Sequence, residues 1–206
     1  MEYLVTMTTH VPDGTPGQAV DDVRAREAAH SRDLAAEGRL VRLWRPPLQP
    51  GEWRSLGLFA AADAGQLQQT LASMPLKIWR TDQVTPLAPH PNDPGPGTRP
   101  GRSGTEFLAT FVITIPDGTP RQAVEEAEAR EAVRARELAD QGHLERLWAL
   151  SGHRRALGLY RAGDSAEMQA IVKALPLDPW MTAELTPLTP HPSDPAAVSS
   201  RDRRKP

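Results

Sequence analysis

The stretch EYLVTMTTHVPDGTPGQAV, residues 2–20, recurs later in the chain as EFLATFVITIPDGTPRQAV, residues 106–124. About half of the aligned residues in the two copies are identical, which is far above chance. In each copy an alternating apolar segment leads into PDGTP, a turn sequence that also suits the start of a helix. The chain therefore contains a repeated unit that begins with a strand, a turn and a helix.

The repeat continues almost to the end of the chain. AAEGRLVRLW, residues 35–44, recurs as ADQGHLERLW, residues 139–148. The endings TPLAPHPND, residues 85–93, and TPLTPHPSD, residues 186–194, also match. Each copy is thus long enough to be a complete small α+β unit of its own.

One segment between the copies has no counterpart. PGPGTRPGRSG, residues 94–104, is rich in Gly, Pro and Ser, as is typical of a flexible linker. The last residues, SSRDRRKP, are polar and predict a disordered end. We therefore expect a first unit at 1–93, a linker at 94–104, a second unit at 105–195 and a disordered tail at 196–206.

Patterning within the first copy predicts the element order βαββαβ. Thr15 is predicted as the N-cap of the first helix, with Pro16 at the first helical position. Gly38 is expected to end that helix, and Asp63 to cap a second one. The expected strands are 3–11, 39–45, 53–61 and 82–88, and the expected helices are 16–37 and 64–74.

This order predicts a ferredoxin-like unit with both helices on one face of the sheet. The other face of the sheet is then apolar and uncovered. Two such units most simply stack sheet against sheet. We therefore predict an α+β fold of two tandem ferredoxin-like units, packed as an intrachain pseudo-dimer of the dimeric α/β-barrel type, which leaves further homo-oligomers open.

Composition narrows the classes of function. The 206 residues carry a net charge of -2, without the basic excess that nucleic-acid binding needs. There is no cysteine, and the six histidines have no metal-ligand spacing, so neither a metal nor another cofactor is expected. No apolar run approaches the roughly 18 residues of a membrane span, and no signal peptide is visible. We expect a cytoplasmic protein with a small-molecule substrate.

A glutamate interrupts the apolar stripe of the long helix in each copy. In the first copy Glu27 projects to the middle of the stripe formed by Val20, Val23 and Leu34. Glu131 has the equivalent position in the second copy. A carboxylate that loses its hydration without gaining a partner has a raised pKa, which suits a general base or acid at neutral pH. The alternative is a buried ion pair with Arg42, Arg146 or Arg24.

The strand after this helix offers candidates for substrate binding. Arg42 and Trp44 share one face of RLVRLWR, as Arg146 and Trp148 do in HLERLWAL. An arginine beside a tryptophan suits the recognition of a flat ligand that carries a carboxylate. The two tryptophans could equally be core aromatics. His153, in the loop SGHRR, is a further candidate for substrate binding.

The residues in each copy resemble those of the muconolactone delta-isomerase family. The similarity rests on AREAAHSRDLAAEGRLVRLWR (25–45), on the endings MPLKIW and LPLDPWM, and on HPSD, and it covers each copy nearly end to end. The resemblance implies a ferredoxin-like fold, large homo-oligomers of single-unit subunits, and a cofactor-free proton shift along a small unsaturated lactone. It also implies that Glu27 and Glu131 are the catalytic glutamates.

The departures from the family pattern concern the polar lining of the expected pocket. Ser55 and Ala156 stand where the family has an asparagine, and Arg42 and Arg146 stand where it has a histidine. Together with the fusion of two units, these changes favour a substrate larger than muconolactone.

Two functions remain open from the sequence. One is an isomerase, or a ring-forming cyclase in a biosynthetic pathway, that uses acid–base catalysis by a buried glutamate. The other is a non-catalytic protein that holds a small ligand or a partner chain, in which both glutamates are paired with arginine.

Overall fold

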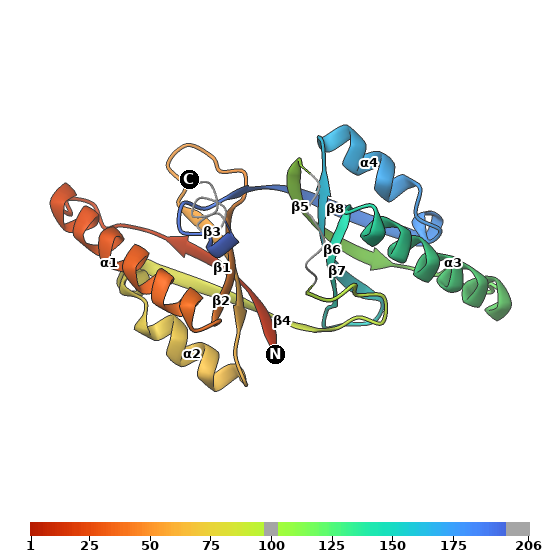
Figure 1. Cartoon of the computed structure of the whole chain (residues 1–206), viewed down its shortest axis with the longest axis horizontal. Helices are drawn as coiled ribbons and strands as arrows, with labels where there is room; N and C mark the ends of the chain where they lie inside the picture. Colours follow the sequence, from red (N-terminus) through yellow and green to blue (C-terminus); the bar gives the residue numbers. More distant parts are fainter. Residues whose placement is uncertain (97–102, 197–206) are drawn as a thin grey trace, which may run out of the picture. The chain divides into compact units, whose positions relative to one another are not determined.

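The computed structural model describes residues 1–96 and 103–196, and Figure 1 shows the course of the chain. The described residues form two compact units, one of residues 1–86 and 189–196 and the other within 87–188. Both repeats have the order βαββαβ, so the predicted α+β class with two ferredoxin-like units is confirmed. The sheet-to-sheet packing of the two units stays a prediction.

The first repeat contains four strands, two α-helices and a short 3-10 helix. Its strands lie in the order β4-β1-β3-β2. The elements are β1 (Glu2–Thr9), α1 (Gly17–Ala36), β2 (Leu40–Arg45), β3 (Arg54–Ala60), α2 (Ala64–Ser73), η1 (Pro75–Trp79) and β4 (Arg80–Pro89).

The second repeat has the same elements in the same order. Its strands lie in the order β8-β5-β7-β6. The elements are β5 (Thr105–Ile113), α3 (Arg121–Asp140), β6 (Leu144–Ala149), β7 (Arg155–Ala162), α4 (Ser165–Lys173), η2 (Asp178–Trp180) and β8 (Met181–Pro190).

Both repeats share one irregularity of strand pairing. In the first repeat the antiparallel pairing of β2 with β3 shifts register between Leu40 and Arg42. In the second repeat the pairing of β6 with β7 shifts at the equivalent place, between Leu144 and Arg146. The two backbones are therefore alike even where the sheet departs from regular pairing, and the repeats can be compared residue by residue.

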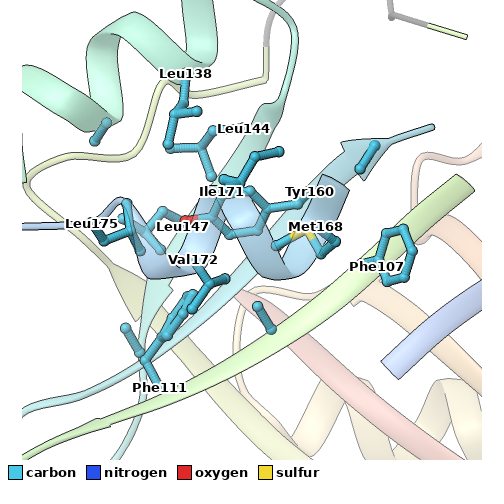
Figure 2. Packing of buried hydrophobic residues seen from close by; sticks show 14 of the residues in the cluster. Phe107, Phe111, Leu138, Leu144, Leu147, Tyr160, Met168, Ile171, Val172 and Leu175 are labelled. Carbon is cyan, nitrogen blue, oxygen red and sulfur yellow. The ribbon is translucent and has the colours of Figure 1, made fainter. Parts of the chain in front are cut away.

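The hydrophobic core of each unit lies between the sheet and its two helices, which cover the same side of the strands in Figure 1. In β1 the alternating residues Tyr3, Val5 and Met7 are buried, because successive side chains of a strand point to opposite faces. They pack with Leu34 of α1 and Leu67 of α2, among others. Figure 2 shows the equivalent core of the second repeat.

The start of the first helix differs from the prediction. The structure has Pro16 as the N-cap of α1, without a side-chain hydrogen bond, and the helix begins at Gly17. The hydroxyl of Thr15 donates instead to the carbonyl of Pro12 at 2.6 Å, which closes the preceding turn. Thr15 as N-cap was therefore wrong, because the turn already uses its hydroxyl.

The other predicted helix signals are confirmed. Gly38 follows the C-cap of α1 with φ +71, a conformation that glycine adopts without strain. Asp63 caps α2, where its Oδ1 accepts a hydrogen bond from the backbone N–H of Gln66 at 2.8 Å. These local signals fix the ends of the helices because each acts within a few residues of the chain.

The ends of the two repeats are exchanged between the compact units. In the unit built from the first repeat, Trp44 and Arg45 of β2 pair with Pro190 and Thr189 of β8. In the other unit, the end of β4 pairs with β6 through Ala88↔Ala149 and Pro89↔Trp148. The predicted units 1–93 and 105–195 stay a prediction, and the compact units divide the chain between residues 86 and 87 and between residues 188 and 189.

Part of the predicted linker, residues 97–102, and the predicted tail from residue 197 onward lie outside the described residues. Within the described part of the chain, none of the helices has the length and apolar character needed to cross a membrane.

Candidate active site

Glu27 forms a buried ion pair. Its side chain on α1 is 12% exposed, and its Oε1 lies 3.1 Å from Nη1 of Arg80, whose side chain is 2% exposed. The other carboxylate oxygen accepts a hydrogen bond from the backbone N–H of Leu76 at 2.8 Å. Both oxygens of Glu27 thus have a partner within the protein.

Arg80 is itself held from several sides. Its Nε donates to Oδ1 of Asp82 at 2.6 Å, and its Nη2 donates to the carbonyl oxygen of Leu71 at 3.2 Å. The Asp82 carboxylate also contacts Lys77 at 2.9 Å. A buried guanidinium with this many acceptors is fixed in place, so Glu27 is fixed with it.

Glu131 has a different environment at the equivalent position on α3. One of its oxygens accepts a hydrogen bond from the backbone N–H of Leu177 at 3.1 Å, as in the first repeat. No cation within residues 1–96 and 103–196 forms an ion pair with it, and Met181 stands where the first repeat has Arg80. Burial raises the pKa of Glu131, partly offset by the Leu177 hydrogen bond and the charge of Arg134.

Each glutamate lines a cavity. The first cavity, beside Glu27, has a volume of about 440 Å³, and the second cavity, beside Glu131, has a volume of about 380 Å³. Volumes of this size are typical of sites for small molecules. Besides the glutamates, the charged and aromatic side chains of the linings include Arg24, Arg45, Trp53, Arg80 and His191 in the first cavity, and His90, Glu128, Arg154 and Tyr160 in the second.

The second cavity is the more apolar of the two at equivalent positions. Four polar or charged residues of the first lining have apolar counterparts in the second. Thr9 corresponds to Ile113, Ser31 to Ala135, Ser55 to Ala156, and Arg80 to Met181. Fewer polar groups surround the carboxylate in the second cavity, so less of its lost hydration is replaced. The raised pKa of Glu131 follows from this difference.

Tyr160 brings a hydroxyl group to the second cavity. Phe59 has its place in the first repeat, so the hydroxyl is specific to the second. The ring packs edge to face against Phe111 at a centroid distance of 6.1 Å, and both aromatic residues line the second cavity. Burial and the charge of Glu131 both raise the pKa of Tyr160, so the phenol stays protonated and can donate a hydrogen bond.

A glycine allows this position of Tyr160. A Cβ atom at Gly158 would collide with Cε2 of the Tyr160 ring, two residues along β7. Gly57 has the same relation to Phe59 in β3, where a Cβ would lie 2.5 Å from the ring. The glycine therefore lets the aromatic ring lie across its own strand.

The rims of the two cavities carry different pairs of side chains. At the first cavity the guanidinium of Arg24 lies over the ring of Trp53 at 5.4 Å. At the second, Nη1 of Arg154 contacts Oε1 of Glu128 at 2.7 Å. Arg154 has φ 55, a left-handed conformation that costs a non-glycine residue about 1 kcal/mol or more.

A histidine from the other repeat lines each cavity. His191 lines the first cavity, and its Nδ1 accepts a hydrogen bond from the backbone N–H of Ser193 at 3.1 Å. His90 lines the second cavity and accepts in the same way from Asn92 at 3.1 Å. Burial lowers the pKa of both, that of His191 to about 4 with help from the charges of Arg45 and Arg24. Both rings are neutral near pH 7 and carry their proton on Nε2.

The structure does not bring Arg42 and Trp44 to the first cavity. Arg42 lies over the ring of Trp44 at 4.8 Å and contacts the carboxylate of Asp194 at 3.2 Å. Asp194 is 1% exposed and also accepts from the backbone N–H of Leu43 at 3.0 Å. Arg42 therefore anchors the exchanged end of the second repeat and does not pair with Glu27.

Arg146 and Trp148 repeat this arrangement in the second unit. Arg146 lies over Trp148 at 4.8 Å and contacts Asp93 at 3.3 Å. Neither residue lines the second cavity. His153 is exposed in the loop before β7, where its Nε2 accepts from Nε of Arg154 at 3.2 Å, and it also lies outside the lining. A role of these residues in substrate binding stays a prediction.

Sequence reasoning missed the partner of Glu27. Arg80 lies at the start of β4, far along the chain from α1, and no periodicity links the two. A signal was nevertheless present, since the aligned position in the second repeat is Met181. Such a difference in charge at one aligned position indicates that the surroundings of the two glutamates differ between the repeats.

The described residues contain no cluster of His, Cys, Asp or Glu with the geometry to hold a metal ion. What the second cavity offers chemically is one carboxylate of raised pKa, one phenol and one cation at the rim.

Comparisons with known proteins agree with the repeat. A sequence model of the muconolactone delta-isomerase family matches residues 1–93 and 105–194. The muconolactone delta-isomerase of Cupriavidus pinatubonensis is 35% identical over 92 residues, which are 97% of that protein and 45% of this chain. Muconolactone delta-isomerase 1 of Acinetobacter lwoffii is 32% identical over 92 residues, which are 93% of that protein and 45% of this chain. One relative thus corresponds in length to one repeat.

A solved structure also resembles the whole chain. A heme-binding protein from Thermus thermophilus has a TM-score of 0.60 and 12% sequence identity, with 98% of this chain and 95% of that chain covered. At this identity the likeness concerns the fold alone.

Proposed function

Since the chain belongs to the muconolactone delta-isomerase family, we propose that its second cavity catalyses a proton shift in a small unsaturated lactone or carbonyl compound. The relatives make the protein an isomerase-like enzyme. The observation that carries the proposal is the position of Glu131, which lines an apolar cavity of about 380 Å³ with a single backbone hydrogen bond and no ion pair to a described residue.

Glu131 acts as the base and then as the acid. Its carboxylate removes a proton from the carbon next to the carbonyl group of the substrate, which leaves an enolate conjugated with the double bond. The protonated carboxyl group then returns the proton to a carbon two positions away, so the double bond moves and no atom is gained or lost. The raised pKa of Glu131 supports this cycle, because a more basic carboxylate is better matched to a weakly acidic carbon.

Tyr160 stabilises the intermediate in this proposal. Its phenol lines the same cavity and stays protonated, so it can donate a hydrogen bond to the oxygen on which negative charge develops. Arg154, at the rim, is the cation that can hold the anionic end of a substrate that carries a carboxylate. These roles require no cofactor.

A ring-forming reaction would use the same equipment. Protonation or deprotonation beside a carbonyl group can also initiate the closure of a ring, and the product distinguishes this cyclase from an isomerase. Both reactions place the proton transfer on Glu131.

The test compares two glutamine variants at equivalent positions. Glu131→Gln keeps the size of the side chain but cannot carry the proton, so kcat for a screened unsaturated lactone is expected to fall about 10²- to 10⁴-fold. Glu27→Gln is the matched control, with kcat within about twofold of the wild type, because Arg80 and not substrate is the partner of Glu27. Full activity of Glu131→Gln, or its loss in Glu27→Gln alone, contradicts the proposal.

A further inference from the structure

The first cavity is lined by more cations than the second, whose lining contains Arg154. Arg24 and Arg45 both line the first cavity, and their counterparts in the second repeat are Glu128 and Ala149. With Arg80 and its counterpart Met181, three cations are specific to the first cavity. The two cavities therefore differ in charge not only at Arg80, which pairs with Glu27, but also at Arg24 and Arg45.

Two of these arginines are available to a ligand. Arg80 is occupied by Glu27 and Asp82, but no described residue forms an ion pair with Arg45. Arg24 has one exposed contact with Asp21 at 3.8 Å, a distance at which an exposed pair contributes little. The first cavity thus holds two guanidinium groups whose ion pairing within the described residues is limited to this exposed contact with Asp21, which also lines the cavity.

The surroundings of the two arginines favour a flat anion. Arg24 lies over the indole ring of Trp53, which places an aromatic surface beside the charge. The charges of both arginines act on His191 and help to lower its pKa, so their positive field reaches into the cavity. A neutral His191 with its proton on Nε2 adds a hydrogen-bond donor without an opposing charge.

We propose that the first cavity is a non-catalytic binding site for a small planar carboxylate, held by Arg24 and Arg45 beside Trp53. Planar guanidinium groups match the geometry of a carboxylate, and the indole ring supplies the apolar contact. Glu27 takes no part in chemistry there, because Arg80 fixes it as a structural ion. This inference does not depend on turnover in the second cavity.

The test measures the binding of benzoate to the full chain by calorimetry, together with the NMR signal of the Trp53 indole N–H. We expect one saturable site on the wild-type protein and a shift of the Trp53 signal. Arg24→Ala and Arg45→Ala are each expected to weaken binding about tenfold, because a hydrogen bond to a charged group is lost in each. Arg45→Ala also gives the first repeat the residue that the second repeat has at the equivalent position, Ala149.

Two controls locate the site. Arg32→Ala removes an exposed arginine of α1 outside the cavity lining, and it should bind benzoate as the wild type does. Glu131→Gln should also bind benzoate normally, so loss of turnover and loss of binding are separate readouts. Since Arg24 and Arg45 have no buried partner, their variants are expected to fold, and Arg45→Gln is a milder second choice.

Three results would overturn the proposal. The first is benzoate binding that survives the double variant Arg24→Ala/Arg45→Ala, and the second is an absence of saturable binding to the wild type. The third is binding that is lost in Glu131→Gln but retained in the arginine variants, which would assign the anion to the second cavity.

Discussion

In the first repeat the carboxylate of Glu27 lies 3.1 Å from the guanidinium of Arg80, whereas in the second repeat Glu131 has Met181 at the place of that arginine. Both glutamates project from the same position of equivalent helices and accept a backbone hydrogen bond from Leu76 or Leu177. The backbone is thus the same, and the first residue of the last strand decides the state of the carboxylate. One repeat thus holds a carboxylate paired with an arginine, while burial raises the pKa of the carboxylate in the other.

The comparison extends to the rest of the lining. Polar residues around Glu27 have apolar counterparts around Glu131, and the aromatic residue of β3 or β7 gains a hydroxyl only in the second repeat. These differences make the second cavity more apolar around the carboxylate and give it a proton donor, whereas Trp53 of the first lining has the charged Arg154 as its counterpart. In the two proposals above, the first copy binds a ligand and the second carries out catalysis.

The largest effect is expected from replacing Arg80, the buried cation that pairs with Glu27. Arg80→Met gives the first repeat the residue of the second and leaves Glu27 without its cation. Breaking a buried ion pair on one side costs about 3–5 kcal/mol, so urea denaturation should show a loss of that order in the free energy of unfolding. A loss below about 1 kcal/mol would mean that the pair contributes little beyond an exposed one.

A matched variant sharpens this result. Asp82 also contacts Arg80 and has Ala183 as its counterpart. Arg80→Met/Asp82→Ala also removes the buried carboxylate that Arg80→Met leaves with Lys77 as its remaining cation, and it should regain part of the lost stability, because one buried charge fewer has lost its arginine.

A smaller effect is expected from the hydroxyl that only the second cavity has. Tyr160→Phe removes the proposed hydrogen-bond donor and should lower kcat about tenfold, the effect of one hydrogen bond to a developing charge. Phe59→Tyr is the control in the first repeat, and it should leave kcat unchanged. An unchanged kcat in Tyr160→Phe with a raised KM would instead assign the phenol to substrate binding alone.

The smallest effect is the dependence of stability on pH. Because burial raises the pKa of Glu131 in the folded protein, the folded state binds its proton more tightly than the unfolded state does. The resulting stabilisation is present below the ordinary pKa of glutamate and is lost as the pH rises through the folded value. Urea denaturation between about pH 4 and about pH 7 should therefore show the wild type losing stability relative to Glu131→Gln.

The raised pKa of Glu131 predicts the direction of this change in relative stability, so the measurement can contradict it. If the free energy of unfolding depends on pH in the same way for the wild type and Glu131→Gln, then Glu131 has the same pKa in the folded and unfolded states. The pH dependence of kcat/KM gives a second reading, since activity should rise with pH as Glu131 ionises, with its midpoint above the ordinary pKa of glutamate.

Local signals in the sequence were sufficient for the order of helices and strands in each repeat. Alternation in β1, the stripe on α1, Gly38 and Asp63 each act within a few residues, so the order βαββαβ could be predicted from them. The sequence repeat showed that the two glutamates occupy equivalent positions, and the residues around them carry the resemblance to the family. The prediction of Thr15 as N-cap failed within the same short range, since two local hydrogen bonds competed for one hydroxyl.

The tertiary structure alone decided the partners of the charged side chains. Arg42 was a candidate partner of Glu27 but binds Asp194, and Glu27 binds Arg80, although neither contact is local in the sequence. The sequence by itself determined that each repeat has a carboxylate on the inner face of its long helix. Which of the two carboxylates meets a cation depends on strands brought together by packing, because electrostatic environment is a property of distance in space and not of distance along the chain.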